Sequence, residues 1–131
     1  MKTRNILSVV LLLLSLQGLH AQSKSGKQDI RVSERCVDFG QVSRKGTPPS
    51  RTIYICNEGE QPLIITHTST TCKCIKSRYS KRPITPRDSI PFKISYQAIR
   101  GEKGHFHKVL RIYTSSKESP CMMVTVQGET M

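Results

Sequence analysis

The chain of 131 residues carries 21 Lys and Arg against 9 Asp and Glu, which gives a formal net charge of +12. Its length fits a single domain with its own hydrophobic core. It contains no Trp, four Tyr and three Phe, too few aromatic rings for a stacking platform that binds single-stranded nucleic acid. We therefore expect the positive charge to keep the protein soluble or to attract an anionic glycan, lipopolysaccharide or a membrane surface, and not nucleic acid.

The first 21 residues have the features of a signal peptide. Lys2 and Arg4 form a charged start, an apolar run extends from Ile6 to Leu16, and Ala21 offers a cleavage point. The run is shorter than the roughly 20 apolar residues that a membrane-spanning helix needs, although an uncleaved anchor is the alternative. No cysteine directly follows the run, which argues against a lipoprotein anchor. We expect a periplasmic or secreted protein without a membrane span once residues 1–21 are removed.

The rest of the chain has the pattern of an all-β domain. A polar leader at residues 22–29, expected to be flexible, is followed by short segments in which apolar and polar side chains alternate. Turn residues separate these segments, and none has a sustained helical period. We predict an Ig-like antiparallel β-sandwich of about seven strands over residues 30–131. Pro91 lies in one predicted strand and suggests an edge or a strand start, because proline cannot donate a ladder hydrogen bond. The clearest segments are Val37 to Val42, Ser50 to Asn57, Leu63 to Thr68, Ile90 to Tyr96, His107 to Thr114 and Met122 to Gln127.

Five short motifs resemble, in order and spacing, a bacterial family of unknown function. They are VDFGQV from Val37, CNEGEQPLIIT from Cys56, CKC from Cys72, PITP from Pro83 and GEKGHFHKVLRIYTSS from Gly101. The resemblance implies an Ig-like domain, similar to major sperm protein and to Hydin-type domains, of a kind common in exported envelope proteins. It implies no activity. The chain departs from the family pattern at Lys73 and Arg87, where the family usually has glycine.

The five cysteines form an odd set, so in an exported protein at least one thiol is free or paired with another molecule. In Ig-like sandwiches the first strand often runs parallel to the last, and Cys36 and Cys121 precede those two strands. A disulfide between them is therefore one expected pairing, and it would stabilise the domain by about 4 kcal/mol. Cys56 follows the inward residue Ile55 and should point away from the core, which makes it the expected odd thiol.

Cys72 and Cys74 open a basic run that contains no acid. They could staple a loop, or form a redox pair, because a disulfide across one residue is tight and a basic surrounding favours the thiolate. They could also bind Cu(I) or Zn(II) as weak metal candidates, with His67 or with His105 and His107 as further ligands. No second cysteine pair supports a zinc site. The basic residues of the run are Lys73, Lys76, Arg78, Lys81, Arg82 and Arg87.

The sequence contains no recognisable pattern of catalytic residues. The nine acids are scattered without acid–base spacing, no serine lies in a nucleophile elbow, and there is no phosphate-binding glycine loop. We therefore predict an exported, non-enzymatic Ig-like binding or structural module of the cell envelope, without a cofactor. Its partner would be an envelope protein or an anionic surface, bound by the loop from Cys72 to Arg87. The alternative is a thiol-redox or copper/zinc-binding protein that uses Cys72 and Cys74.

Overall fold

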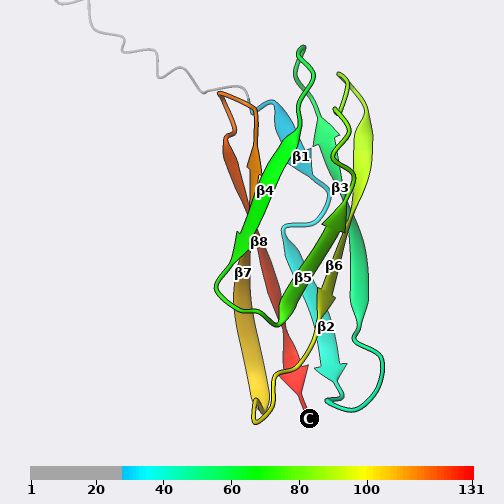
Figure 1. The fold of residues 1–131 in the computed structure, drawn as a ribbon, viewed down its shortest axis with the longest axis vertical. Coiled ribbons are helices and arrows are strands. Elements are labelled where there is room, and N and C mark those ends of the chain that lie inside the picture. The colour runs from blue at the N-terminus through cyan, green and yellow to red at the C-terminus, as the bar shows by residue number, and fades with distance from the viewer. Residues whose placement is uncertain (1–27) are drawn as a thin grey trace, which may run out of the picture.

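The computed structural model describes residues 28–131, which form a sandwich of two four-stranded β-sheets (Figure 1). The predicted signal peptide and residues 22–27 of the predicted leader lie outside the described residues. Residues 28–131 contain no helix with the length and hydropathy that crossing a membrane requires. The strands are β1 (Ile30–Val32), β2 (Cys36–Val42), β3 (Ser50–Asn57), β4 (Ile65–Thr70), β5 (Ile75–Tyr79), β6 (Ser89–Tyr96), β7 (Gly104–Thr114) and β8 (Cys121–Thr130).

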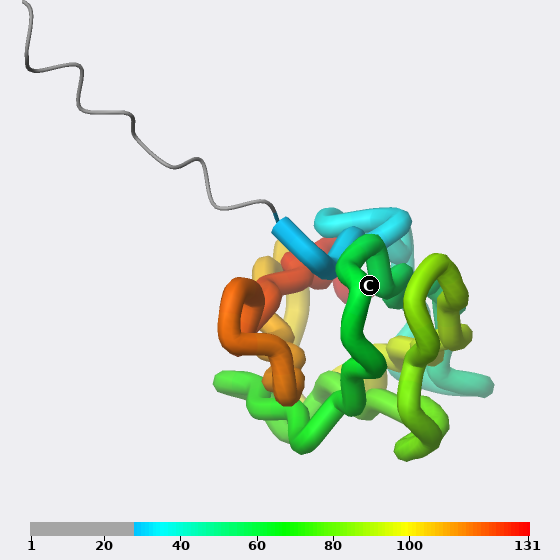
Figure 2. The backbone as a smooth tube through the Cα atoms, turned by 90° about the horizontal axis from the view of Figure 1, so that it is seen from above, coloured from blue at the N-terminus to red at the C-terminus, as the bar shows by residue number. Residues whose placement is uncertain are grey.

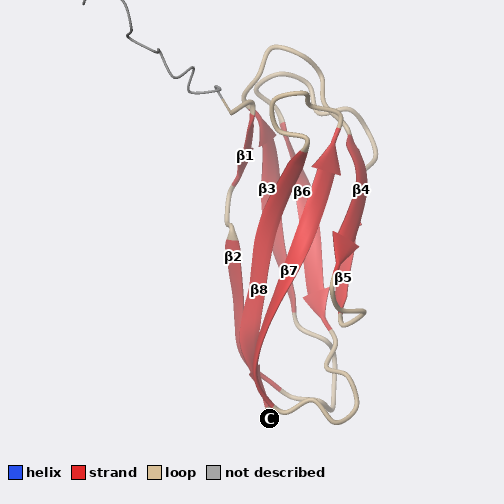
Figure 3. Ribbon diagram, turned by 90° about the vertical axis from the view of Figure 1, so that its left-hand side faces the viewer, coloured by secondary structure: helices blue, strands red, loops and turns tan. Residues whose placement is uncertain are grey.

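The two sheets have simple strand orders. Sheet A runs β1-β3-β6-β5 and sheet B runs β2-β8-β7-β4. Most of the connecting loops lie at the two ends of the sandwich, whereas the link from β1 to β2 lies part-way along it (Figure 3). A view along the long axis shows the backbone of the two sheets end-on (Figure 2). This arrangement confirms the predicted Ig-like β-sandwich, with eight strands in the described residues where about seven were expected.

The first part of the sandwich divides between the two sheets. β1 pairs antiparallel with β3 in sheet A, whereas β2 pairs parallel with β8 in sheet B. Ser33 ends the first segment, because its N–H donates to the Tyr54 carbonyl and its hydroxyl accepts from the Tyr54 N–H, both at 2.9 Å. The parallel pairing of β2 with the last strand is the relation expected from Ig-like topology.

Period-two alternation builds the core between the sheets. In β6 the inward residues Ile90, Phe92, Ile94 and Tyr96 are each 0% exposed. In β3 the inward Ile53 and Ile55 are buried, whereas Tyr54 between them is 49% exposed. Burying a side chain of this size contributes about 1.5–3 kcal/mol. These residues therefore hold the two sheets together.

Two strands were not predicted from the sequence. β1 has only three residues, and β5 lies inside the segment that was interpreted as a loop. Pro91 also lies in the central strand β6, not at an edge or a strand start. The proline is tolerated there because β5 ends at Tyr79, opposite Phe92, so that no β5 residue needs a hydrogen bond from position 91.

A buried asparagine at the end of β3, the strand that ends near the top of Figure 1, joins two of the family-like motifs. Asn57 is 1% exposed, and its amide nitrogen donates to the carbonyls of Gln61 and Ile84 at 2.7 and 2.8 Å. Its side-chain oxygen accepts from the Gly59 N–H at 2.9 Å. One side chain thus fixes the turn after β3 against the segment that leads to β6.

A polar network ties three strands together at the opposite, lower end. The Tyr96 hydroxyl donates to Glu102 at 2.9 Å and lies 3.1 Å from the Thr130 hydroxyl, while Lys108 forms an ion pair with Glu102 at 3.0 Å. Burial raises the pKa of Tyr96. Burial alone would also raise the pKa of Glu102, but the hydrogen bonds from Lys108 and Tyr96 outweigh it and hold that pKa below 4.5. The turn between β6 and β7 is therefore firmly held.

Candidate binding surface

The Cys72 and Cys74 side chains form a disulfide in the turn that carries the chain from β4 in sheet B to β5 in sheet A. Cys74 is 1% exposed and belongs to the core, and Cys72 is half-buried against it. The Thr70 hydroxyl accepts from the Cys72 N–H at 3.2 Å, and the Gln97 N–H donates to the Cys74 carbonyl at 2.8 Å. The turn is thus pinned at both of its ends.

The residues after this turn form an edge strand, which corrects the predicted contact loop. In β5 the side chains of Ile75 and Tyr79 point inward, and the Tyr79 ring stacks on Phe92 with centroids 5.0 Å apart. Lys76 and Arg78 point outward and are exposed. β5 pairs with β6 on one side and with no described strand on the other.

The free side of β5 offers backbone hydrogen-bonding groups. The Cys74 carbonyl points toward β6, where it accepts from Gln97. Because direction alternates along an antiparallel strand, Lys76 and Arg78 bond toward β6, and the N–H and C=O groups of Ser77 and Tyr79 face outward. No described residue bonds to them. A partner strand would find these groups unpaired.

Three basic side chains lie together on the outer face of this edge. Arg78 stands opposite Lys93 of β6, and Lys76 stands opposite Ser95. We call Lys76, Arg78 and Lys93 the basic edge. None of them forms an ion pair with a described residue, and the outward positions of β5 and β6 contain no acid. Like charges side by side are unfavourable, so an acidic partner would relieve their repulsion.

The other basic residues of the predicted surface lie elsewhere. Lys73 is exposed in the disulfide turn, and Lys81, Arg82 and Arg87 belong to the loop between β5 and β6. Arg82 forms an ion pair with Asp88 at 3.4 Å. The six residues therefore do not form one contact loop, because the strand β5 separates its two ends.

Arg87 occupies a position that suits glycine. Its φ is 63°, it follows Pro86, and the Asp88 N–H donates to the Thr85 carbonyl at 3.0 Å. A proline followed by a residue of positive φ, closed by this hydrogen bond, defines a type II turn. This geometry explains why the family pattern has glycine where this chain has Arg87.

The acids that form ion pairs lie away from the basic edge. Arg31 pairs with Glu58 at 2.6 Å and Arg51 with Glu34 at 3.5 Å. The hydrogen bond that Arg31 donates to Glu58 raises the pKa of Arg31. These contacts neutralise basic residues on β1 and β3, so the unpaired charge of sheet A lies on β5 and β6.

The predicted bridge between Cys36 and Cys121 does not form, and both cysteines are free and exposed. Cys36 stands opposite Thr125, four residues along β8 from Cys121, which is about 13 Å along the strand. Because β1 lies in sheet A, the chain joins sheet B only at Cys36, part-way along β8 and beyond reach of Cys121. Cys56 is half-buried and also free, on the side of β3 away from the core as expected.

The candidate metal ligands do not come together. The His67 ring stacks on Tyr113 at 4.2 Å on the outer face of sheet B, and the sulfurs of Cys72 and Cys74 bond to each other. His105 and His107 lie on β7, opposite Glu129 and Gln127 of β8. Within residues 28–131, no three His, Cys, Asp or Glu side chains form a group that could hold a metal ion.

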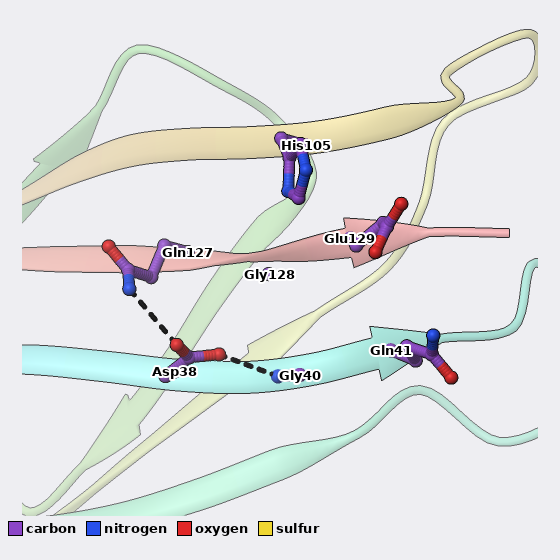
Figure 4. A pocket seen from close by; sticks show the side chains of 7 residues that line it. All are labelled: Asp38, Gly40, Gln41, His105, Gln127, Gly128 and Glu129. Atoms are coloured by element: carbon purple, nitrogen blue, oxygen red, sulfur yellow. Dashed lines mark hydrogen bonds between the residues drawn. The ribbon is translucent and has the colours of Figure 1, made fainter.

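A shallow depression on sheet B brings polar side chains from β2, β8 and β7 together (Figure 4). Asp38 accepts from the Gly40 N–H at 2.7 Å and from the Gln127 amide at 3.0 Å. The hydrogen bond from Gln127, followed by that from Gly40, lowers the pKa of Asp38. Each carboxylate oxygen therefore supports the irregular pairing of β2 with β8, and Asp38 is not poised as an acid or a base.

Two glycines shape this depression. Gly40 has a φ of 61° at the bulge of β2. A Cβ atom on Gly128 would lie 2.7 Å from the Gly40 carbonyl oxygen and 2.7 Å from the Phe106 ring. The two strands can approach here only because position 128 lacks a side chain.

Sequence reasoning missed the strand character of the basic edge, although a signal was present. IKSRY alternates Ile75, Ser77 and Tyr79 with Lys76 and Arg78, which is the period of a half-buried strand. Its basic residues, Lys76 and Arg78, are equally typical of a solvated loop. Lys93 was missed because only strand pairing places it beside Arg78.

Residues 30–130 match the family described as "Protein of unknown function (DUF1573)". The chain belongs to this family. The match extends over nearly all described residues, and the resemblance inferred from the five motifs is confirmed. No curated protein is similar to the chain in sequence.

Several solved structures have a fold similar to that of this chain. A protein of unknown function from Porphyromonas gingivalis W83 gives a TM-score of 0.67 at 19% identity, over 76% of this chain and 46% of that chain. The PapD-like domain 7 of human CEP192 gives 0.65 at 9% identity, over 86% and 92%. The YadV chaperone gives 0.59 at 12%, over 79% and 52%. The chain thus spans less than half of the P. gingivalis protein, and these similarities show the fold alone.

Proposed function

We propose that this DUF1573 domain is an exported, non-enzymatic binding module of the cell envelope. Its partner would be an envelope protein, which it binds by pairing an extended acidic segment with the free edge of β5. The observation that carries the proposal is the basic edge: Lys76, Arg78 and Lys93 lie unpaired beside a strand with no described neighbour on its outer side.

The free backbone supplies the attraction for any extended chain. The outward N–H and C=O groups of Ser77 and Tyr79 can each bond to an added strand, and addition of a strand to an exposed sheet edge is a recurring mode of peptide recognition. Each such hydrogen bond contributes about 0.5–1.5 kcal/mol net. β5 is short, so these bonds alone give weak binding and charge must add to it.

The basic side chains select the partner. A second copy of β5 would bring Lys76 and Arg78 against like charges, which disfavours self-pairing between edges. An acidic segment would instead place carboxylates beside Lys76 and Arg78. Repulsion of a second β5 strand and attraction of an acidic segment would act together, as is usual in specific interfaces.

Export is part of the proposal because of the features of residues 1–21, with Lys2 and Arg4 before an apolar run and Ala21 after it. The disulfide between Cys72 and Cys74 suits an oxidising compartment. A PapD-like domain and a chaperone share this fold, although a fold alone does not assign a function.

Binding of a labelled peptide that alternates Glu and Thr tests the proposal. We expect Lys76→Glu with Arg78→Glu to weaken binding at least tenfold, because two attractions become repulsions. The matched control is Arg35→Glu with Lys117→Glu, which makes the same change of charge at two exposed positions away from β5 and should have little effect at physiological salt.

The same peptide with alternate backbone nitrogens methylated separates strand addition from charge alone. It keeps every carboxylate but lacks the N–H donors along the edge that would face β5, so we expect its binding to be lost. Equal binding of the two peptides would rule out strand addition. If the Lys76 and Arg78 changes weakened binding of heparin but not of the peptide, an anionic glycan would replace the acidic segment as the partner.

A further inference from the structure

Two loops and Met131 form a second surface at the lower end of the sandwich (Figure 1). One loop, residues 43–49, joins β2 to β3, and the other, residues 97–103, joins β6 to β7. Residues 43–45, residues 98–100 and Met131 line one depression there. This end is separate from the outward face of β5.

The surface exposes apolar side chains. Ile99 is 49% exposed and Met131 is 59% exposed, two of the five large hydrophobic side chains that are exposed in the described residues. The Glu102 N–H donates to the Ile99 carbonyl at 3.1 Å, and Gly101 has a φ of 88°. The chain therefore makes a hydrogen-bonded turn that projects Ile99 to solvent.

Basic side chains surround these apolar groups. Arg44, Lys45, Arg100 and Lys103 are all exposed on the two loops, and the Arg44 side chain donates to the Met131 carbonyl at 3.1 Å. The acid in these loops, Glu102, turns inward, where it bonds to Lys108 at 3.0 Å. Its side chain is 17% exposed, so it does not offset the basic charge at the surface.

We propose that this end patch, defined as Arg44, Lys45, Ile99 and Arg100, docks the domain end-on to an anionic lipid bilayer. An exposed apolar side chain within a group of Lys and Arg matches the boundary of such a bilayer, where acyl chains accept the apolar group and anionic headgroups attract the cations. A single exposed isoleucine means little. Ile99, however, lies among exposed cations, and Glu102, the acid of the same turn, faces inward.

Docking at this end would leave β5 free to bind a partner. The end patch belongs to the loops at one end of the sandwich, whereas the basic edge lies on the face of sheet A. The two surfaces have different partners and share no residue, so each can be tested while the other is intact.

Sedimentation with vesicles measures the docking directly. We would use the chain from Gln22 onward, which contains every described residue and leaves out the apolar segment that could itself bind lipid. Vesicles of phosphatidylcholine with about one-third phosphatidylglycerol should bind it, and vesicles of phosphatidylcholine alone should not. Arg44→Glu with Lys45→Glu should lower the partition coefficient at least thirtyfold, whereas Lys76→Glu with Arg78→Glu should have a much smaller effect.

The apolar contact has its own test, because the chain contains no Trp. Ile99→Trp introduces a single indole at the end patch, and Met123→Trp introduces one at an exposed position on sheet B. On addition of the anionic vesicles we expect a blue-shifted emission from the first variant and none from the second. Ile99→Ser should weaken vesicle binding about tenfold, while Met123→Ser should leave it unchanged.

Three results of the vesicle experiments would overturn the proposal. They are equal binding to both kinds of vesicle, equal effects of Ile99→Ser and Met123→Ser, and an unshifted emission from the Ile99→Trp variant. A blue shift without vesicles that depends on protein concentration would show that a second copy covers the patch, which also contradicts lipid docking.

Discussion

At the residue scale, Arg87 and Asn57 illustrate opposite relations between side chain and backbone. Arg87 has the left-handed backbone that favours glycine, with a φ of 63°, and its exposed side chain forms no described ion pair. Asn57 is 1% exposed and uses its side-chain donors and acceptor on three backbone groups. We therefore expect replacement of Arg87 by glycine to stabilise the domain and replacement of Asn57 to destabilise it.

Replacement of Arg87 by glycine should stabilise the domain. The left-handed conformation costs a residue with a Cβ atom about 1–2 kcal/mol. Glycine avoids this cost, but it loses more conformational entropy on folding, which offsets part of the gain. We expect Arg87→Gly to raise the free energy of unfolding by about 0.5–1 kcal/mol in urea denaturation. Arg87→Ala keeps the Cβ atom and is the control. An equal gain in the alanine variant would contradict the backbone explanation.

Removal of the Asn57 side chain should destabilise the domain strongly. Asn57→Ala deletes three hydrogen bonds and leaves the buried carbonyl of Ile84 without this donor, so we expect a loss of about 2–4 kcal/mol of unfolding free energy. Gln61→Ala, an exposed change that keeps the Gln61 carbonyl, should cost less than about 0.5 kcal/mol. Similar losses in the two variants would show that Asn57 does not hold this corner.

At the element scale, most strands were predictable because one face of each is buried. Ser50 to Asn57 was predicted with the bounds that β3 has, since Ile53 and Ile55 alternate with outward residues. β5 was missed because its outward Lys76 and Arg78 resemble a solvated loop. β1 was missed because three residues carry too little pattern. The missing bridge between Cys36 and Cys121 was beyond prediction, since the change of sheet after β1 sets where Cys36 lies.

The disulfide between Cys72 and Cys74 should contribute a modest stability to β5. It closes a loop of three residues, for which the chain-entropy relation gives roughly 1.5 kcal/mol. Cys72→Ser with Cys74→Ser should lower the free energy of unfolding by about this amount, while the fold remains because Thr70 and Gln97 still hold the turn. A reductant should lower the wild type to the same level and leave the variant unchanged. Unfolding of the double variant in buffer would contradict this account.

The polar network of Tyr96, Glu102 and Lys108 should make the free energy of unfolding depend on pH in the acidic range. The pKa of Glu102 lies below its ordinary value of 4.5 in the folded chain, where Lys108 and Tyr96 bond to the carboxylate. Its contribution is therefore complete above the unfolded-state pKa and is lost as the pH falls through the folded-state pKa. In urea denaturation between about pH 5 and pH 3, Glu102→Gln should lose less stability than the wild type. Parallel curves for the two proteins would argue against this role.

At the scale of the whole molecule, the basic side chains of residues 28–131 are unevenly distributed over the surface. Ion pairs neutralise Arg31, Arg51, Arg82 and Lys108. The basic edge and the end patch keep exposed cations without such acids. Composition predicted an attraction to anions, but only the pairing of β5 with β6 and the meeting of two loops show where exposed cations gather.

Amide exchange measured by NMR, with and without the acidic peptide, tests the central claim most directly. If the peptide adds as a strand beside β5, the outward amides of Ser77 and Tyr79 should exchange more slowly in its presence, and shift changes should concentrate on Ile75–Tyr79 and on Lys93. Shift changes on Lys76 and Arg78 without protection of Ser77 and Tyr79, or changes confined to another face, would contradict strand addition at this edge.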